Sequence, residues 1–214
     1  VVNITATADG GYQFVNWTGD TGTIADPDAA STTITMLGNY SITANFESAA
    51  PPGATLEGHV SFAARGSAPS SRWVETFVVK LFQPGNLSNV LWSGNATTNE
   101  SGVFIISNLT PGTYDIGIKN HTCLSILRTN KTLTAGNTTV VDFGTTKEGD
   151  CKSPPNDKVD GFDASALSSA YNTVPGDPKW NPAADLNRSG KVDGFDASLL
   201  SANYNQVGDA FGYF

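Results

Sequence analysis

The sequence predicts a mainly β, multidomain protein that ends in a small α-helical domain. Residues 1–48 and 54–147 contain runs that alternate apolar and polar residues, the pattern of half-buried strands. A Pro- and Gly-containing stretch at 49–53 separates them as a linker. From residue 148 the composition changes to Asp, Ala, Ser and Leu, with two helical patterns inside an internal repeat. We therefore expect three domains, at 1–48, 54–147 and 148–210, and an aromatic tail at 211–214.

Bulk properties exclude several classes of function. The 214 residues include 12 basic and 20 acidic side chains, a net charge of −8 that argues against nucleic-acid binding. No apolar run is long enough for a membrane span. The single methionine, Met36, is internal, so we expect a mature fragment whose signal peptide has been removed. The sequence has two His, no zinc motif, no phosphate loop and no nucleophile elbow, and so predicts no enzyme.

The first segment predicts short strands separated by turns. Thr-rich runs at 4–7 and 33–36 alternate, and Gly-containing turns lie at 9–11 and 37–39. The stretches TATADGGYQFVNWTGD and ADPDAASTTITMLGNYSITANF resemble the bacterial InlB-type B-repeat, a small β-grasp-like module of surface proteins. The resemblance covers the later part of that module and omits its opening hairpin, so we expect an exposed sheet edge. Its aromatic core candidates are Tyr12, Phe14, Trp17 and Phe46.

The second segment predicts a β-sandwich. Phe104 and Ile106 would point inward on one strand, and Tyr114, Ile116 and Ile118 on the next. A Pro-Gly turn at 111–112 would join these strands. The stretch TTNESGVFIISNLTPGTYDIGIKN resembles the carboxypeptidase-regulatory-like, or prealbumin-like, sandwich, an Ig-like fold that is a common spacer in exported proteins and has no activity of its own.

The third segment contains a duplication. The sequence KVDGFDASALSSAYN at 158–172 recurs as KVDGFDASLLSANYN at 191–205, with 12 of 15 positions identical. A repeat at this spacing indicates two copies of one supersecondary unit. Each copy ends a candidate calcium loop and begins a helix.

The second copy completes a 12-residue EF-type loop at 185–196. Calcium is a hard cation that takes six to eight oxygens, and this loop offers them at the expected spacing around a turn glycine, Gly190. The alternative is an Asp- and Asn-rich turn that caps a helix. The predicted ligands are Asp185, Asn187, Ser189, Lys191 through its carbonyl, Asp193 and Asp196.

The first copy departs from this pattern. With Val159 aligned to Val192, Asp150 lies two residues too early to be the first ligand, so an insertion within CKSPPND must bulge out. Asp157 then replaces the turn glycine. The predicted ligands are Asp150, Asn156, Lys158 through its carbonyl, Asp160 and Asp163, and the two loops together predict two Ca²⁺ ions.

An Asp at the last loop position, followed directly by a helix, distinguishes this segment from ordinary EF-hands. On these residues, 148–210 resembles a type I dockerin. The resemblance implies a cohesin-type β-sandwich partner, which contacts the residues around the last ligand. Here these residues are Phe162 and Phe195, with their neighbours Gly161, Ala164, Ser165, Gly194, Ala197 and Ser198.

The two cysteines, Cys123 and Cys151, could be free thiols, half of a metal site or a disulfide. Neither lies in a CxxC pair, so we predict a disulfide, worth about 3 kcal/mol in the chain-entropy model. It would join the sandwich to the dockerin-like segment and brace the first loop.

Eleven N-x-S/T sequons suggest an exported glycoprotein, because they are roughly threefold more frequent than the composition predicts. Alternatively, a Thr- and Asn-rich β protein uses these residues in strands and turns. We expect Asn187, a calcium ligand, to carry no glycan. The predicted glycosylation sites are Asn3, Asn16, Asn39, Asn86, Asn95, Asn99, Asn108, Asn120, Asn130 and Asn137.

Two functions remain open for a secreted or cell-surface protein of this kind. One is a docking module that binds a cohesin-like domain. The other, narrowly favoured by the sequence, is a structural subunit that polymerises head to tail into a fibre. In the fibre, the tail aromatics Phe211, Tyr213 and Phe214 would contact the N-terminal module of a neighbour.

Overall fold

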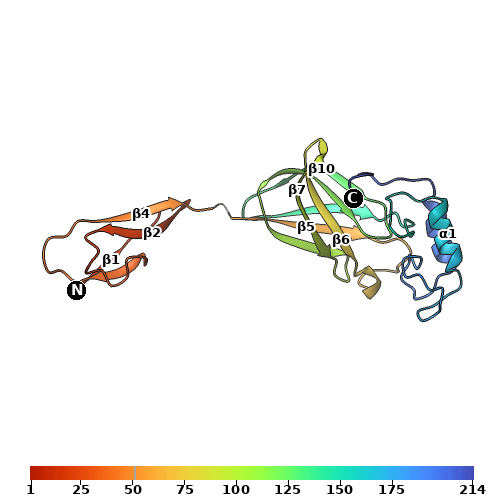
Figure 1. Ribbon diagram of the computed structural model, residues 1–214, viewed down its shortest axis with the longest axis horizontal. Helices are drawn as coiled ribbons and strands as arrows, with labels where there is room; N and C mark the ends of the chain where they lie inside the picture. The colour runs from red at the N-terminus through yellow and green to blue at the C-terminus, as the bar shows by residue number, and fades with distance from the viewer. Residues whose placement is uncertain (51) are drawn as a thin grey trace. The chain divides into compact units, whose positions relative to one another are not determined.

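The computed structural model describes residues 1–50 and 52–214, so Pro51 of the expected linker lies outside the described residues. The chain forms two compact units, Val1–Pro52 and Gly53–Phe214. The mainly β fold class is confirmed, with two short helices near the C-terminus (Figure 1). No helix among the described residues has the length and apolar character needed to cross a membrane.

The smaller unit contains two antiparallel strand pairs. Strand β1 (Val2–Thr5) pairs with β3 (Ser31–Ile34), and β2 (Tyr12–Gly19) pairs with β4 (Ile42–Ser48). Trp17, Ile24 and Ile34 are buried between them, and the Trp17 indole donates to the Ala29 carbonyl at 3.0 Å.

Four aromatic residues were predicted to lie in the core of this unit, and for two of them the prediction is wrong. Trp17 is buried and Phe14 is partly buried, but Tyr12 and Phe46 are 56% and 40% exposed. A register shift after Phe14 separates this end of the β2–β4 pair from the Trp17 end. Tyr12 and Phe46 therefore line a shallow surface hollow rather than the core.

The larger unit begins with a seven-stranded sandwich. One sheet has the order β10-β9-β6-β7 and the other β11-β5-β8, with β11 parallel to β5 and every other pair antiparallel. The bounds are β5 (Ala54–Ser61), β6 (Thr76–Gln83), β7 (Asn86–Thr97), β8 (Val103–Leu109), β9 (Gly112–Lys119), β10 (Ile126–Leu133) and β11 (Thr138–Thr145), with a 3-10 helix, η1 (Ser71–Trp73).

The inward alternation predicted for the sandwich is confirmed. Phe104 is buried and Ile106 partly buried, whereas Ile105 between them is 62% exposed. On β9, Ile116 and Ile118 are fully buried. The two sheets thus enclose one apolar core.

The chain then forms helices α1 (Gly161–Ser169) and α2 (Gly194–Ala202). Each begins with a capping box, in which Asp160 or Asp193 accepts a hydrogen bond from the first turn and the Asp three residues later accepts one from the cap backbone. Val159 and Val192 are buried in a core beneath the helices, together with Leu124 from the sandwich. Sandwich and helices therefore share apolar packing within one unit.

The C-terminal tail lies against its own sandwich (Figure 1). The Phe214 ring meets the Phe82 ring edge-on at 6.2 Å between centroids, and the Lys80 ammonium lies 4.9 Å from the Phe214 centroid. Phe211 and Tyr213 are partly exposed. Phe214, which was predicted to contact a neighbouring subunit, therefore already contacts side chains of its own sandwich.

Candidate functional site

Asp185 organises the second loop. Its Oδ1 accepts a hydrogen bond from the Ser189 N–H at 2.9 Å, and its Oδ2 accepts one from the Gly190 N–H at 2.8 Å. Gly190 has φ +82°, a left-handed conformation that glycine adopts without a steric penalty. The carboxylate therefore closes the loop around its own turn.

Asp196 ties the end of this loop to α2. Its two oxygens accept from the Asn187 N–H at 3.1 Å and the Asp193 N–H at 2.8 Å. Burial raises the pKa of Asp196 above its ordinary value, and the nearby Asp185 and Asp193 carboxylates add to the shift. A buried carboxylate beside two others is a place where a cation would be favourable.

The donor set of the second loop fits calcium. An ionised carboxylate has about four lone-pair sites, so Asp185 and Asp196 retain acceptor capacity beyond the bonds above. Amide, hydroxyl and carbonyl oxygens of Asn187, Ser189 and Lys191 belong to the same loop. In the part of the chain that is described, no three His, Cys, Asp or Glu side chains form a group that could hold a metal ion.

The first loop repeats the hydrogen-bond scaffold of the second. Asp150 Oδ1 accepts from the Asn156 N–H at 3.0 Å and Oδ2 from the Asp157 N–H at 2.7 Å, the bonds that Asp185 makes with Ser189 and Gly190. Asp157 takes the left-handed conformation of the turn glycine, with φ +62°. Asp163 caps the Asp160 N–H at 2.8 Å, as Asp196 does for Asp193. Which of these groups bind a metal remains a prediction.

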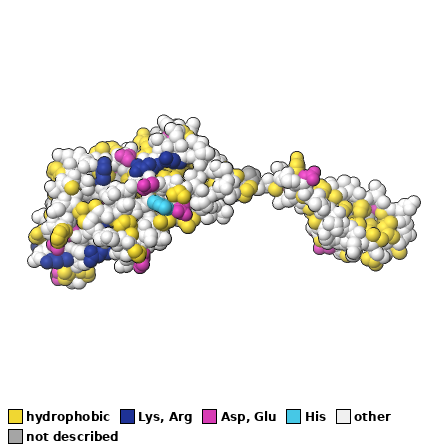
Figure 2. All heavy atoms as spheres, turned by 180° about the vertical axis from the view of Figure 1, so that it is seen from behind, with side chains coloured by type: hydrophobic (Ala, Val, Ile, Leu, Met, Phe, Trp, Pro, Cys, Tyr) yellow, Lys and Arg dark blue, Asp and Glu magenta, His cyan; other side chains and the backbone are white. Residues whose placement is uncertain are grey.

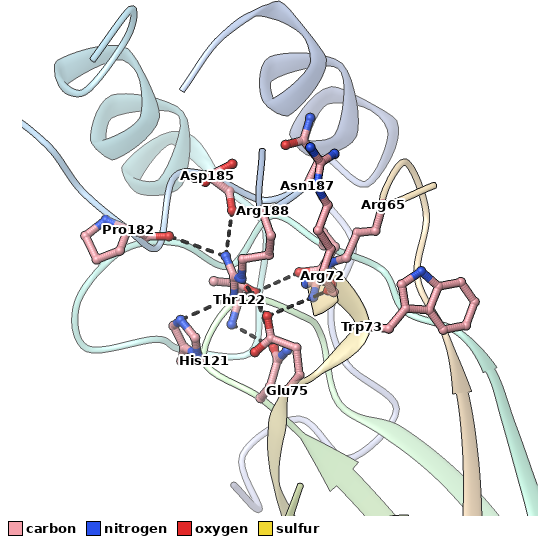
Figure 3. Close-up of polar contacts among 12 residues, drawn as sticks. Arg65, Arg72, Trp73, Glu75, His121, Thr122, Pro182, Asp185, Asn187 and Arg188 are labelled. Atoms are coloured by element: carbon pink, nitrogen blue, oxygen red, sulfur yellow. Dashed lines mark hydrogen bonds and ion pairs between the residues drawn. The ribbon is translucent and has the colours of Figure 1, made fainter. Parts of the chain in front are cut away.

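Arg188, which the sequence analysis did not single out, joins the second loop to the sandwich (Figure 3). Its guanidinium donates to the Asp185 carbonyl at 2.6 Å, the Glu75 carboxylate at 2.5 Å and the Thr122 hydroxyl at 3.3 Å. Burial alone would raise the pKa of Glu75, but Arg188 and then Arg65 outweigh it and hold that pKa below its ordinary value.

The network continues into the sandwich. The Arg65 guanidinium, fully buried, pairs with Glu75 at 2.8 Å and with Glu148 at 2.9 Å. No spacing rule relates residues so far apart in the sequence. The one sequence signal was a loop arginine, Arg188, flanked by two predicted ligands.

The predicted partner-facing phenylalanines occupy matched positions on the surface. Phe162 and Phe195 are each 71% exposed, in the first turns of α1 and α2. Between the helices lies an apolar groove of about 330 Å³. It is lined by Ala164, Leu167, Ser168, Tyr171, Ala197 and Leu200. Exposed aromatic side chains and apolar grooves are both typical of protein-binding surfaces.

On the face that Figure 2 shows, acidic and basic side chains of the larger unit occur in small groups among uncharged atoms.

The predicted disulfide is wrong, because Cys123 and Cys151 are both free thiols. Cys123 lies in the sandwich core and Cys151 in the core beneath the helices. The Cys151 thiol donates to the Asp163 carbonyl at 3.4 Å. Each thiol therefore packs as a small apolar group in its own core, and the junction is held by charged side chains instead.

Asn120 is also wrong as a glycosylation site. It is buried, and its side-chain oxygen accepts from the Thr122 and Cys123 N–H groups at 2.9 and 2.7 Å. The side-chain Nδ2, which would carry the glycan, is buried in the folded chain. Asn187 is buried as well.

Comparisons with known proteins agree with this geometry. Residues 1–50 match the family model described as the divergent InlB B-repeat domain, and residues 155–204 match that of the dockerin type I domain. None of the curated proteins matches the chain.

Two solved structures share the fold of the larger part of the chain. Both are type II cohesin–X-dockerin complexes from Acetivibrio cellulolyticus, one a C-terminal and one an N-terminal interface mutant. They are 20% and 19% identical, each with a TM-score of 0.58, and each match covers 74% of this chain and 99% of the other.

The two family models and the two loop–helix units together identify the modules. The chain carries a divergent InlB B-repeat domain at its N-terminus and a type I dockerin domain near its C-terminus, with a β-sandwich between them.

Proposed function

We propose that the chain is a non-catalytic, extracellular docking module whose dockerin domain binds calcium and then a cohesin-type partner. The observation that carries this proposal is the pair of loop–helix units, which present Phe162 and Phe195 at equal exposure and have an apolar groove between their helices. Calcium would hold the second loop through the carboxylates of Asp185 and Asp196. Because that loop leads directly into α2, the ion would fix the helix that carries Phe195.

The similarity to the cohesin–X-dockerin complexes supports the same proposal. It extends over the sandwich and the dockerin together rather than over the helices alone, since it covers 74% of this chain. The shared packing and the Arg65–Glu75–Arg188 network support a sandwich that acts as a rigid base for the dockerin. B-repeat and dockerin domains are typically extracellular, and we propose the same location here.

Binding to a panel of type I and type II cohesin domains tests the docking proposal. The wild-type chain should bind at least one of them in calcium, measured by biolayer interferometry. Replacing both Phe162 and Phe195 by Ala should weaken that binding at least tenfold, because exposed aromatics are frequent hot spots. Phe211→Ala, a change to an exposed aromatic outside the helices, is the matched control and should have no effect.

If no cohesin binds the wild-type chain, the docking proposal fails. If the double variant binds as well as wild type, the surface lies elsewhere than on the helix N-termini.

We propose N-glycosylation at the remaining nine sequons, whose side chains all reach the surface at least in part. Intact mass should then exceed 22.4 kDa in material from the native source. A native mass equal to the bare chain would contradict this.

A head-to-tail fibre is the second candidate, and it now rests on the apolar surface of the smaller unit. Tyr12, Phe46 and Leu37 are exposed there, and a neighbouring copy could cover them. The packing of Phe214 on its own sandwich weighs against the tail as the connector. Sedimentation velocity at increasing concentration tests this candidate, and a monomer throughout would end it.

A further inference from the structure

The two loops share a scaffold but differ at their third position. The Lys152 N–H donates to Asp163 Oδ1 at 2.9 Å, the bond that Asn187 makes with Asp196 in the second loop. Lys152 therefore occupies the place of Asn187, but an ammonium side chain has no oxygen to offer a metal. Its Nζ instead lies 5.4 Å from the centroid of the Phe162 ring. The first loop thus lacks a side-chain ligand that the second loop has.

A lysine from the sandwich brings a positive charge to the first loop. Lys119, the last residue of β9, donates from Nζ to Asp150 Oδ2 and to the Cys123 carbonyl, both at 2.7 Å. The side chains of Lys119 and Asp150 are 8% and 0% exposed. In the second loop, the described partner of the equivalent oxygen, Asp185 Oδ2, is the Gly190 N–H.

The acid at the turn of the first loop also faces the sandwich. The Asp157 carboxylate accepts from the Ser125 N–H and the Ser125 hydroxyl, both at 2.6 Å, and its Oδ1 lies 3.7 Å from Lys119 Nζ. Both Asp150 and Asp157 are buried. The Lys119 ammonium thus lies close to two buried carboxylates of the first loop.

We propose that the first loop is a metal-independent clasp, in which Lys119 takes the place of calcium in holding Asp150, and that the chain binds one calcium ion, in its second loop. This rests on the proposed calcium-binding function of the second loop. A dication bound by Asp150 would lie close to a buried ammonium, and like charges disfavour each other at such short range. With this clasp, the expected number of Ca²⁺ ions per chain is one, rather than the two expected from the sequence.

Calcium stoichiometry of the full chain tests this directly. After chelation and buffer exchange, titration with CaCl₂ followed by calorimetry and native mass spectrometry should give one ion per chain. Two ions per chain would overturn the clasp and leave the calcium function standing. No ion at all would remove the calcium function itself, and the inference with it.

Two matched substitutions assign the ion to a loop. Asn156→Ala and Ser189→Ala remove side-chain oxygens at equivalent loop positions. Ser189→Ala should weaken calcium binding several-fold, because affinity depends on the ligand count. Asn156→Ala should leave both affinity and stoichiometry unchanged, and a loss of affinity in this variant would contradict the clasp.

A third substitution tests Lys119. Lys119→Met leaves Asp150 and Asp157 buried without their cation, which is strongly destabilising. Its melting temperature should fall by the same amount in calcium and in EGTA, because the clasp does not use the metal. A melting temperature equal to that of wild type, or one that is lowered only in EGTA, would show that Lys119 does not serve as the clasp.

Discussion

At the residue scale, the two cysteines illustrate how burial controls chemistry. Burial raises the pKa of both thiols to about 12, and acidic neighbours, Glu148 for Cys123 and Asp163 for Cys151, add to the shift. A thiol reacts as its thiolate, so neither should react at neutral pH in the folded chain. A thiol reagent at pH 8 should therefore label none in the native protein and two per chain in denaturant. Rapid native labelling of either cysteine would contradict the packing.

The lowered pKa of His121 has a measurable effect on the stability of the folded chain. Burial and then the Arg188 charge lower the pKa of His121 below its ordinary 6.5, although Glu75 and Glu148 oppose them. Below pH 6.5 the unfolded chain binds a proton more readily than the folded chain does. The contribution of His121 to stability is therefore present above pH 6.5 and is lost as the pH falls.

Denaturant unfolding at pH 7.5 and pH 5.5 checks the His121 prediction. The loss of stability between the two pH values should be smaller in His121→Gln than in wild type. An unaltered pH dependence in His121→Gln would contradict the account.

At the element scale, the junction between the second loop and the sandwich depends on Arg188. Arg188→Ala would leave Glu75, whose side chain is 9% exposed, with Arg65 as its remaining partner and would release the Asp185 carbonyl. The loss of these bonds should destabilise the larger unit by about 1–3 kcal/mol. Thermal denaturation measures this, with Arg72→Ala, an exposed arginine of η1, as the control. Equal melting of the two variants would show that the network does not hold the loop.

The elements also show where sequence reasoning succeeds. The spacing of the second loop predicts its turn glycine and its helix start, because both depend on residues within one short segment. The alternation on β8 and β9 likewise predicts which residues face the core. The partners of Asp150 and Asp157 could not be predicted from the sequence. Lys119 contacts Asp150 and Ser125 contacts Asp157 only because the fold brings these distant residues together. The disulfide prediction is wrong for the same reason, because the fold places the two cysteines in two separate apolar cores.

At the scale of the whole molecule, calcium should stabilise one unit and not the other. The sandwich and dockerin form a single compact unit, so an ion in the second loop should raise the melting temperature of both together. At about 100-fold excess over Kd the gain is about 2.7 kcal/mol, or a shift of roughly 5–10 °C for a unit of this size. Scanning calorimetry in calcium and in EGTA should show this shift, with a separate, unshifted transition for residues 1–52. An identical scan in both buffers would contradict calcium binding.

We propose that calcium enables docking. The most direct test uses a cohesin that the full chain binds. The affinity of the chain for this cohesin is measured by biolayer interferometry over a series of buffered free-calcium concentrations. Binding should appear as calcium fills the second loop, vanish in EGTA, and be lost in Asp196→Ala, which removes the carboxylate that joins the loop to α2. Equal cohesin binding in calcium and in EGTA would contradict the claim, since the docking surface would then form without the metal.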